Sequence, residues 1–213
     1  MAPLPQGDDL SQAVWLGGSA CAGKTTVARL LAARHGLTLY STDEAFEAHR
    51  RRADERRHPH FRRLMDLPPE RLFAPPAGAQ AADLLGFYRD EFEMVLEDLR
   101  ALSGPVLVEG VGLLPDLVAA AAPDPRRALW LIATPGFRRH DYPRRGDFVR
   151  DLLASCPDPQ AAFDRWMERD DLVARHLEEE AIRLGRQVLT VDGERGIEGS
   201  AELVAERLGL QGL

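Results

Sequence analysis

The residues from Gly18 to Thr25 have the types and the spacing of a loop that binds phosphate. They fit the pattern G-x-x-x-x-G-K-[ST], in which backbone amides cradle nucleotide phosphates, the lysine reaches the β- and γ-phosphates and the hydroxyl binds Mg²⁺. Lys24 is the only lysine among 27 basic residues, and all the others are arginines. The ammonium of lysine is a compact point charge, whereas the guanidinium of arginine is planar and larger. The single lysine therefore occupies the position in the loop where arginine would be a poor substitute. The pattern predicts a nucleotide site in which Lys24 also acts in catalysis.

The segments that flank this loop predict the structure that it requires. Residues 13–17 read as a short buried strand, and residues 26–34 are good helix formers. A strand, a glycine loop and a helix in this order form a phosphate site at the helix N-terminus. We therefore expect the nucleotide to contact the loop and the residue after it, namely Gly18, Ser19, Ala20, Cys21, Ala22, Gly23, Lys24, Thr25 and Thr26.

Further apolar runs along the chain read as buried strands that alternate with helices. Short continuous runs, in place of alternating apolar and polar residues, are typical of parallel strands that are covered on both faces. The chain is therefore predicted to be an α/β protein. The expected strands cover residues 37–41, 105–109, 128–133 and 187–191, with a long helix over 79–102 and a closing helix over 197–208.

Carboxylates follow two of these strands, at the edge where open parallel sheets bind their ligands. Glu109 ends the third strand and fits the acidic group that holds Mg²⁺ together with Thr25. Asp43 follows the second strand and is the better candidate for accepting the proton of an acceptor hydroxyl; it is also a candidate metal ligand. The alternatives are a helix N-cap for Asp43 and a turn cap for Glu109. The sequence leaves open which of the two is the base.

Glycine, proline and arginine recur between Pro135 and Arg145, as in a mobile lid that brings guanidinium groups to a transferring phosphoryl group. We expect Arg138, Arg139 and Arg145 to act in catalysis from this lid. Two more arginines lie four residues apart on the next helix. They either point to the same place or pair with nearby carboxylates in solvent; these are Arg165 and Arg169.

Residues 45–63 are predicted to be helical and are strongly basic. Their cations form either a solvated face, as charge runs usually do, or a wall for an anionic acceptor, which Arg89 could join. The histidines of this segment lack Cys or Asp partners at ligand spacing, so no zinc site is expected; they are His49, His58 and His60.

The composition limits the class of protein. At 213 residues, 45% of them hydrophobic, the chain can bury the core of one domain. A net charge of −7 argues against a general binder of nucleic acid or of membrane surfaces. No apolar run is long enough to span a bilayer, and the polar N-terminus lacks a secretion signal. Two cysteines give no disulfide framework, so a cytoplasmic location is expected.

With these motifs the chain resembles the P-loop kinases of small molecules and nucleotides, such as shikimate, gluconate and cytidylate kinases and chloramphenicol phosphotransferase. Residues 108–115 are also similar to the third-strand segment of 2-phosphoglycerate kinases, and Arg169 to Asp171 with Arg175 are similar to a lid-side motif of cytidylate kinases. The resemblance implies an α/β three-layer P-loop NTPase fold. Its five strands would form a parallel sheet in the order 2-3-1-4-5, with a helical substrate-binding insertion and an arginine-rich lid.

The resemblance also implies roles and boundaries. It implies that Asp192, Gly193 and Arg195 pass near the adenine, and that Asp43 contacts the acceptor hydroxyl. The implied organisation is a single P-loop kinase-like domain over residues 1–213. Its parts are a core of 13–43, 104–134 and 186–213, a helical substrate region of 44–103, and the lid with its following helix at 135–185.

The sequence thus predicts a phosphotransferase that uses ATP and Mg²⁺ to phosphorylate a hydroxyl, or a phosphate, of a small metabolite or antibiotic. The acceptor is a small molecule that can be anionic, nucleic acid and membranes are not expected partners, and the protein is a monomer or a homodimer. Two alternatives stay open. One is a nucleotide-driven switch or ATPase without an acceptor, and the other is a polynucleotide 5′-hydroxyl kinase that uses the basic segment. The preference for ATP over GTP rests on the resemblance alone.

Overall fold

The strands of the protein lie in one parallel sheet. The computed structural model describes residue 10 and residues 13–210. In this part of the chain the strands are β1 (Val14–Gly18), β2 (Thr38–Ser41), β3 (Val106–Glu109), β4 (Ala128–Ala133) and β5 (Gln187–Val191). They form a five-stranded sheet in the order β2-β3-β1-β4-β5, and every neighbouring pair is parallel. The predicted fold class and strand order are therefore confirmed.

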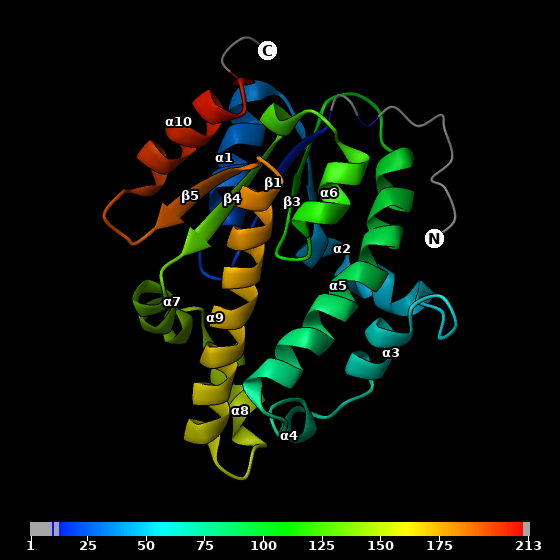
Figure 1. The fold of residues 1–213 in the computed structure, drawn as a ribbon, viewed down its shortest axis with the longest axis vertical. Helices are drawn as coiled ribbons and strands as arrows, with labels where there is room; N and C mark the ends of the chain where they lie inside the picture. The colour runs from blue at the N-terminus through cyan, green and yellow to red at the C-terminus, as the bar shows by residue number, and fades with distance from the viewer. Residues whose placement is uncertain (1–9, 11–12, 211–213) are drawn as a thin grey trace.

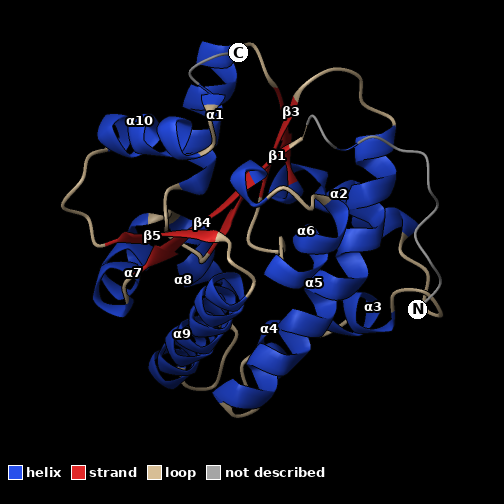
Figure 2. Ribbon diagram, turned by 45° about the horizontal axis from the view of Figure 1, so that its top comes forward, coloured by secondary structure: helices blue, strands red, loops and turns tan. Residues whose placement is uncertain are grey.

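Two hydrophobic cores lie on opposite faces of the sheet. Successive side chains of β1 point to alternate faces, so Leu16 belongs to one core and Trp15 to the other. The core around Leu16 is closed by helices α1 (Lys24–His35) and α10 (Ile197–Arg207). The core around Trp15 is closed by the helices α5 (Ala77–Arg100), α6 (Pro115–Ala121) and α9 (Pro159–Arg183). Figures 1 and 2 show these two helical layers on either side of the strands.

A helical insertion joins β2 to β3. It consists of α2 (Thr42–Arg52), α3 (Pro59–Met65), the single turn α4 (Pro69–Leu72) and α5. The predicted continuous helix over residues 45–63 is wrong, because the chain leaves the helix after Arg52 and enters a new one at Pro59.

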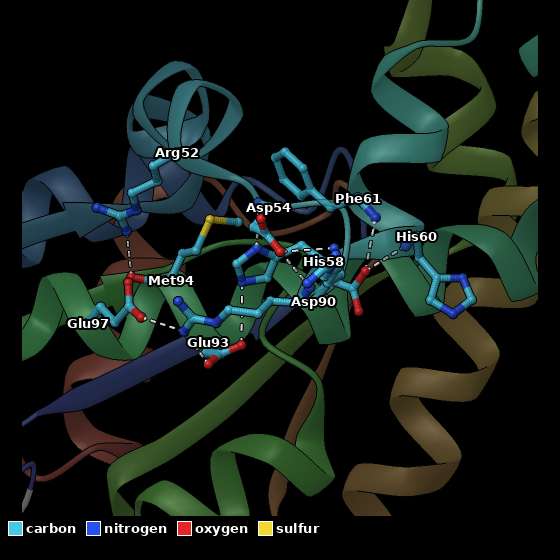
Figure 3. Close-up of polar contacts among 11 residues, drawn as sticks. Arg52, Asp54, His58, His60, Phe61, Asp90, Glu93, Met94 and Glu97 are labelled. Atoms are coloured by element: carbon cyan, nitrogen blue, oxygen red, sulfur yellow. Dashed lines mark hydrogen bonds and ion pairs between the residues drawn. The ribbon is translucent and has the colours of Figure 1, made fainter.

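The break between α2 and α3 has a local and a distant cause. The Asp54 carboxylate accepts hydrogen bonds from the backbone N–H groups of Arg56 and Arg57, at 2.9 and 3.0 Å, which stabilises a turn. The Asp90 carboxylate of α5 then accepts from the first N–H groups of α3, those of His60 and Phe61, at 2.7 and 3.0 Å (Figure 3). A cap supplied by another helix leaves no signal in the local sequence.

The predicted lid segment is a set of short helices. After β4 come α7 (Pro135–Asp141), the 3₁₀ turn η3 (Tyr142–Arg144) and α8 (Asp147–Ala154), and another 3₁₀ turn, η2 (Pro125–Arg127), precedes β4. The side chains of this segment pack with Phe73 and Trp166 in a separate cluster. Within the described residues no helix is long and apolar enough to cross a membrane.

Candidate active site

The loop between β1 and α1 has the geometry of a phosphate cradle. Gly18, Cys21 and Gly23 have φ values of 130°, 60° and 74°, which turn the backbone sharply between strand and helix. A Cβ on Gly18 would lie 2.0 Å from the carbonyl oxygen of Leu131 on β4, so only glycine fits there. The N-cap of α1 makes no side-chain hydrogen bond, so the first amides of that helix are available to an anion.

Lys24 is held inside this loop. Its side chain is buried, and its Nζ donates a 2.7 Å hydrogen bond to the backbone oxygen of Ser19. Ser19 is itself fixed, because its hydroxyl accepts a 2.8 Å hydrogen bond from the Ala133 amide of β4. Burial lowers the pKa of the Lys24 ammonium below its ordinary value, against the opposing effect of Glu109 and Asp43. Loop, ammonium and carboxylates therefore occupy one small region.

Glu109 links the ends of three neighbouring strands. Its side chain is 1% exposed, and the Thr25 hydroxyl donates to its carboxylate, at 3.2 Å to Oε1 and 3.3 Å to Oε2. The Ser41 hydroxyl donates to Oε1 from the other side. Parallel pairing sets Glu109 level with Ser41 of β2 and Leu16 of β1, which explains why residues far apart in sequence meet here. The predicted metal ligands Thr25 and Glu109 are brought together.

Asp43 lies at the start of α2. This helix begins at Thr42 with Ser41 in the N-cap position, so Asp43 does not occupy the cap that was its alternative role. Its exposed side chain lines a cavity of about 670 Å³ that also opens onto the phosphate loop. Asp43 therefore borders the same cavity as Lys24 and Arg145.

The predicted lid arginines have different surroundings. Arg138 is 1% exposed, pairs with Asp171 of α9 and donates a 2.6 Å hydrogen bond to the Ala133 carbonyl oxygen. Arg139 pairs with Asp164 and does not line the cavity, and neither does Arg138. Arg145 does line it. Its guanidinium carbon lies 5.6 Å from the centre of the Tyr142 ring and 5.7 Å from that of Phe148.

Four residues that line the cavity form a polar network that the sequence analysis largely missed. They are Tyr142, Trp166, Arg169 and Asp170. The Asp170 carboxylate accepts from Arg169 Nε and Nη2 through Oδ1, at 2.9 and 2.7 Å, and from the Tyr142 hydroxyl through Oδ2, at 2.7 Å. Trp166 Nε1 donates to the Tyr142 hydroxyl at 3.2 Å. Trp166, Arg169 and Asp170 share one face of α9 by their spacing, which was the available signal. Arg165, by contrast, donates to the Phe73 carbonyl oxygen and lies outside the cavity.

The loop after β5 also contributes to the lining of the cavity. Gly193 and Arg195 line it, together with Val191, Ile197 and Ser200. Asp192 lines a smaller adjoining pocket of about 150 Å³, and its carboxylate accepts a 3.0 Å hydrogen bond from the Glu194 amide. A Cβ on Gly193 would lie 2.7 Å from the Phe137 ring of α7, so a side chain would push the two segments apart.

The basic residues between Glu44 and Arg63 do not line this cavity. Arg57, in the turn between α2 and α3, pairs with Glu93 and Glu97 of α5, which Figure 3 labels, and Arg63 of α3 pairs with Asp83. Arg89 of α5 pairs with Asp116. No residue from 44 to 83 lines the cavity. Of the two interpretations of the basic segment, the structure favours a charged outer face.

The sheet order and the phosphate loop define an α/β protein of the P-loop fold. No protein-family model matches the chain, and no curated protein matches its sequence. Solved structures similar to it include shikimate kinases from Aquifex aeolicus (18% identity, 92% of this chain and 96% of that chain covered, TM-score 0.44) and Bacteroides thetaiotaomicron (19%, 92% and 98%, 0.46). A third is the shikimate kinase from Acinetobacter baumannii in complex with shikimate (20%, 93% and 91%, 0.41). These belong to the kinases that the sequence resembles.

Proposed function

We propose that the protein is a kinase that transfers the γ-phosphate of ATP to a hydroxyl group of a small molecule. The observation that carries the proposal is that the phosphate loop, Asp43 and Arg145 border a single cavity. A phosphate grip, a carboxylate for the incoming hydroxyl and a guanidinium for the transferring group are the parts that phosphoryl transfer needs.

The residues around Thr25 fit a magnesium ion. Mg²⁺ usually takes one or two carboxylates, substrate phosphates and waters, and it prefers oxygen ligands. Thr25 Oγ1 and the Glu109 carboxylate are such ligands and already lie within hydrogen-bond distance of each other, and Asp43 lines the same cavity. Among the described residues no cluster of three or more His, Cys, Asp or Glu side chains could hold a metal alone, so substrate phosphates would complete the shell. The ion would supply charge neutralisation on those phosphates.

The protein's own groups then have separate tasks. The loop amides and Lys24 hold the β- and γ-phosphates, and the fixed backbone leaves little reorganisation to the reaction itself. Asp43 orients the acceptor hydroxyl and takes its proton, while Arg145 stabilises the charge that develops on the transferring phosphoryl group. Arg138 and Arg139 support the lid from outside the cavity, because their ion pairs join α7 to α9. The loop of Asp192, Gly193 and Arg195 receives the base.

The alternative of a polynucleotide kinase has less support. It would use the basic segment to hold a nucleic acid, yet the basic side chains that pair with α5 carboxylates do not line the cavity. Most cations of this outer face are already paired with carboxylates, so the face offers fewer phosphate contacts.

The proposal is tested by turnover. Purified protein is incubated with MgATP and a broad library of hydroxyl compounds, and products are identified by mass spectrometry as a gain of one phosphate. Wild type should yield a phosphorylated product, and Lys24→Met and Asp43→Asn should each reduce the rate by about 10²-fold or more. Turnover that survives in both variants would rule out the proposed mechanism, and ATP binding without any transfer would support the switch.

A further inference from the structure

Two long helices and the turn after β3 contribute mostly apolar side chains to the lining of the cavity. We call this surface the acceptor wall. It comprises Leu84 and Tyr88 of α5, Val111 of the turn, and Trp166, Arg169 and Val173 of α9. Helices α5 and α9 pack against each other along the same face of the sheet (Figure 1). Most of the wall is thus aliphatic or aromatic, and Phe148 of α8 adds an aromatic ring at the rim, 47% exposed.

The cation of the acceptor wall is already neutralised. Arg169 makes two hydrogen bonds with the buried Asp170, and its guanidinium carbon lies 5.5 Å from the Trp166 ring centre and 5.9 Å from that of Phe73. Both oxygens of Asp170 are engaged, one by Arg169 and one by Tyr142. A guanidinium held in this way is a poor counter-ion for a second carboxylate, because it would have to share its charge.

The charge balance of the whole cavity also argues against a negatively charged acceptor. The described residues that line it include four cations and three carboxylates, namely Lys24, Arg145, Arg169 and Arg195 against Asp43, Asp141 and Asp170. Buried Glu109 beside Thr25 adds a fourth carboxylate and brings the balance to zero. Magnesium-bound ATP adds about two negative charges. An anionic acceptor would then enter a site that already carries excess negative charge, which is costly away from bulk water.

We propose that the acceptor is an uncharged hydroxyl compound with an apolar, ring-containing body, which lies between α5 and α9 against Tyr88 and Trp166. This inference rests on the proposed kinase function. The hydroxyl oxygen of the acceptor forms a bond to the γ-phosphorus while the bond from that phosphorus to the β,γ-bridging oxygen breaks. The hydroxyl proton passes to Asp43, and ADP leaves. The ring gains contact with aromatic side chains, and no charge of the acceptor has to be desolvated.

The proposal is tested with matched alcohols that differ only in charge. The probes are cyclohexylmethanol, 4-(hydroxymethyl)cyclohexanecarboxylate and 4-(aminomethyl)cyclohexylmethanol, each with MgATP, and kcat/KM is taken from the phosphorylated product. The neutral alcohol should exceed both charged alcohols by about tenfold or more. A preference for the carboxylate or the amine would overturn the inference and leave the kinase function intact. Transfer to a charged member of the broad library but to none of its neutral alcohols would also overturn the inference and leave the kinase function intact, whereas ATP binding without transfer to any library compound would contradict the proposed function itself.

A variant pair separates the wall from general effects on folding. Leu84→Arg places a cation in the acceptor wall, and Ala82→Arg places one on an exposed position of the same helix that does not line the cavity. Leu84→Arg should lower kcat/KM for the neutral alcohol about tenfold, and it should reduce or invert the ratio of kcat/KM for the neutral alcohol to kcat/KM for the carboxylate. Ala82→Arg should leave this ratio unchanged. If the ratio is the same in both variants, and both unfold at the temperature of wild type, the wall does not contact the acceptor and the inference is overturned.

Discussion

The hydroxyl of Thr25 donates a hydrogen bond to the carboxylate of Glu109, 3.2 Å away, although 84 residues separate them in the chain. The contact exists because β1 and β3 are neighbours in the sheet, so a residue in the first turn of α1 meets the residue that ends β3. It joins the phosphate loop to the acidic strand end.

The first prediction concerns this contact. Glu109→Gln keeps the shape of the side chain and removes its charge, so the affinity for Mg²⁺ should fall. We expect kcat to drop by about 10²-fold and the Mg²⁺ concentration for half-maximal rate to rise. Steady-state rates over a Mg²⁺ titration measure both. Ser41→Ala removes only a hydrogen bond to the same carboxylate and should cost less than about tenfold. An unchanged Mg²⁺ dependence in Glu109→Gln would exclude the carboxylate as a ligand.

The second prediction separates binding from stability at Lys24. Burial lowers the pKa of this ammonium relative to the unfolded chain, so the charged form costs stability at every pH below the folded-state pKa, and the cost declines as the pH rises above it. Lys24→Met removes the buried charge. The variant should unfold at the same temperature as wild type or higher, while its affinity for MgATP falls by about 100-fold. Calorimetry measures both quantities. A lower unfolding temperature would mean that the ammonium stabilises the loop.

The third prediction distinguishes two neighbouring arginines of the lid. Both side chains are exposed, but only that of Arg145 lines the cavity. Arg145→Gln should reduce kcat by about 10²- to 10³-fold with a smaller change in KM, because the guanidinium acts mainly on the charge of the transition state. Arg144→Gln should stay within about threefold of wild type. The assignment of Arg145 fails if the two variants lose activity equally.

The fourth prediction concerns a buried histidine outside the cavity. His49 is fully buried, and its ring nitrogens lie 2.9 Å from a Glu91 carboxylate oxygen and 3.0 Å from an Asp98 oxygen, so it ties α2, which carries Asp43, to α5. His49→Leu leaves Glu91 buried without this partner and should cost about 3–5 kcal/mol of the free energy of unfolding. Arg50→Gln, at the exposed neighbour, should change it by about 0.5 kcal/mol at most. Urea titrations give both values, and a loss below about 1 kcal/mol for His49→Leu would contradict this role.

The fifth prediction concerns pH. Burial alone would raise the pKa of Asp98, but hydrogen bonds from Arg52, Tyr40 and His49 outweigh it, and the pKa lies below its ordinary value of 3.8. A lowered carboxylate pKa contributes stability that is present above the unfolded-state value and is lost as the pH falls through the folded-state value. Wild type should therefore be more stable than Asp98→Asn at neutral pH, and the difference should shrink below about pH 4. A difference that stays constant down to pH 2 would exclude the carboxylate charge as its source.

The strands and the phosphate loop could be predicted because their signals are local. Short apolar runs mark strands that are buried on both faces, and the loop combines glycines, a lysine and a threonine within eight consecutive positions. Helix α5 was also predicted, within two residues at each end, from apolar residues at helical spacing. The break at residues 53–58 was not predicted. One of its two causes is the cap that Asp90 of α5 provides to the start of α3, and the local sequence gives no sign of this cap.

The sequence by itself determined which groups this protein has for chemistry: a loop for phosphate, carboxylates at two strand ends and a run of arginines before α9. Only the tertiary structure decided which of these groups line the cavity and which are buried in ion pairs elsewhere. Arg138 and Arg145 have the same side chain and lie in the same segment, yet one is buried against Asp171 and the other lines the cavity. The reason is physical: Arg138 lies on the face of α7 that packs against α9, whereas Arg145 follows the 3₁₀ turn η3, and which of the two is buried is decided by contacts between segments that are distant in the chain.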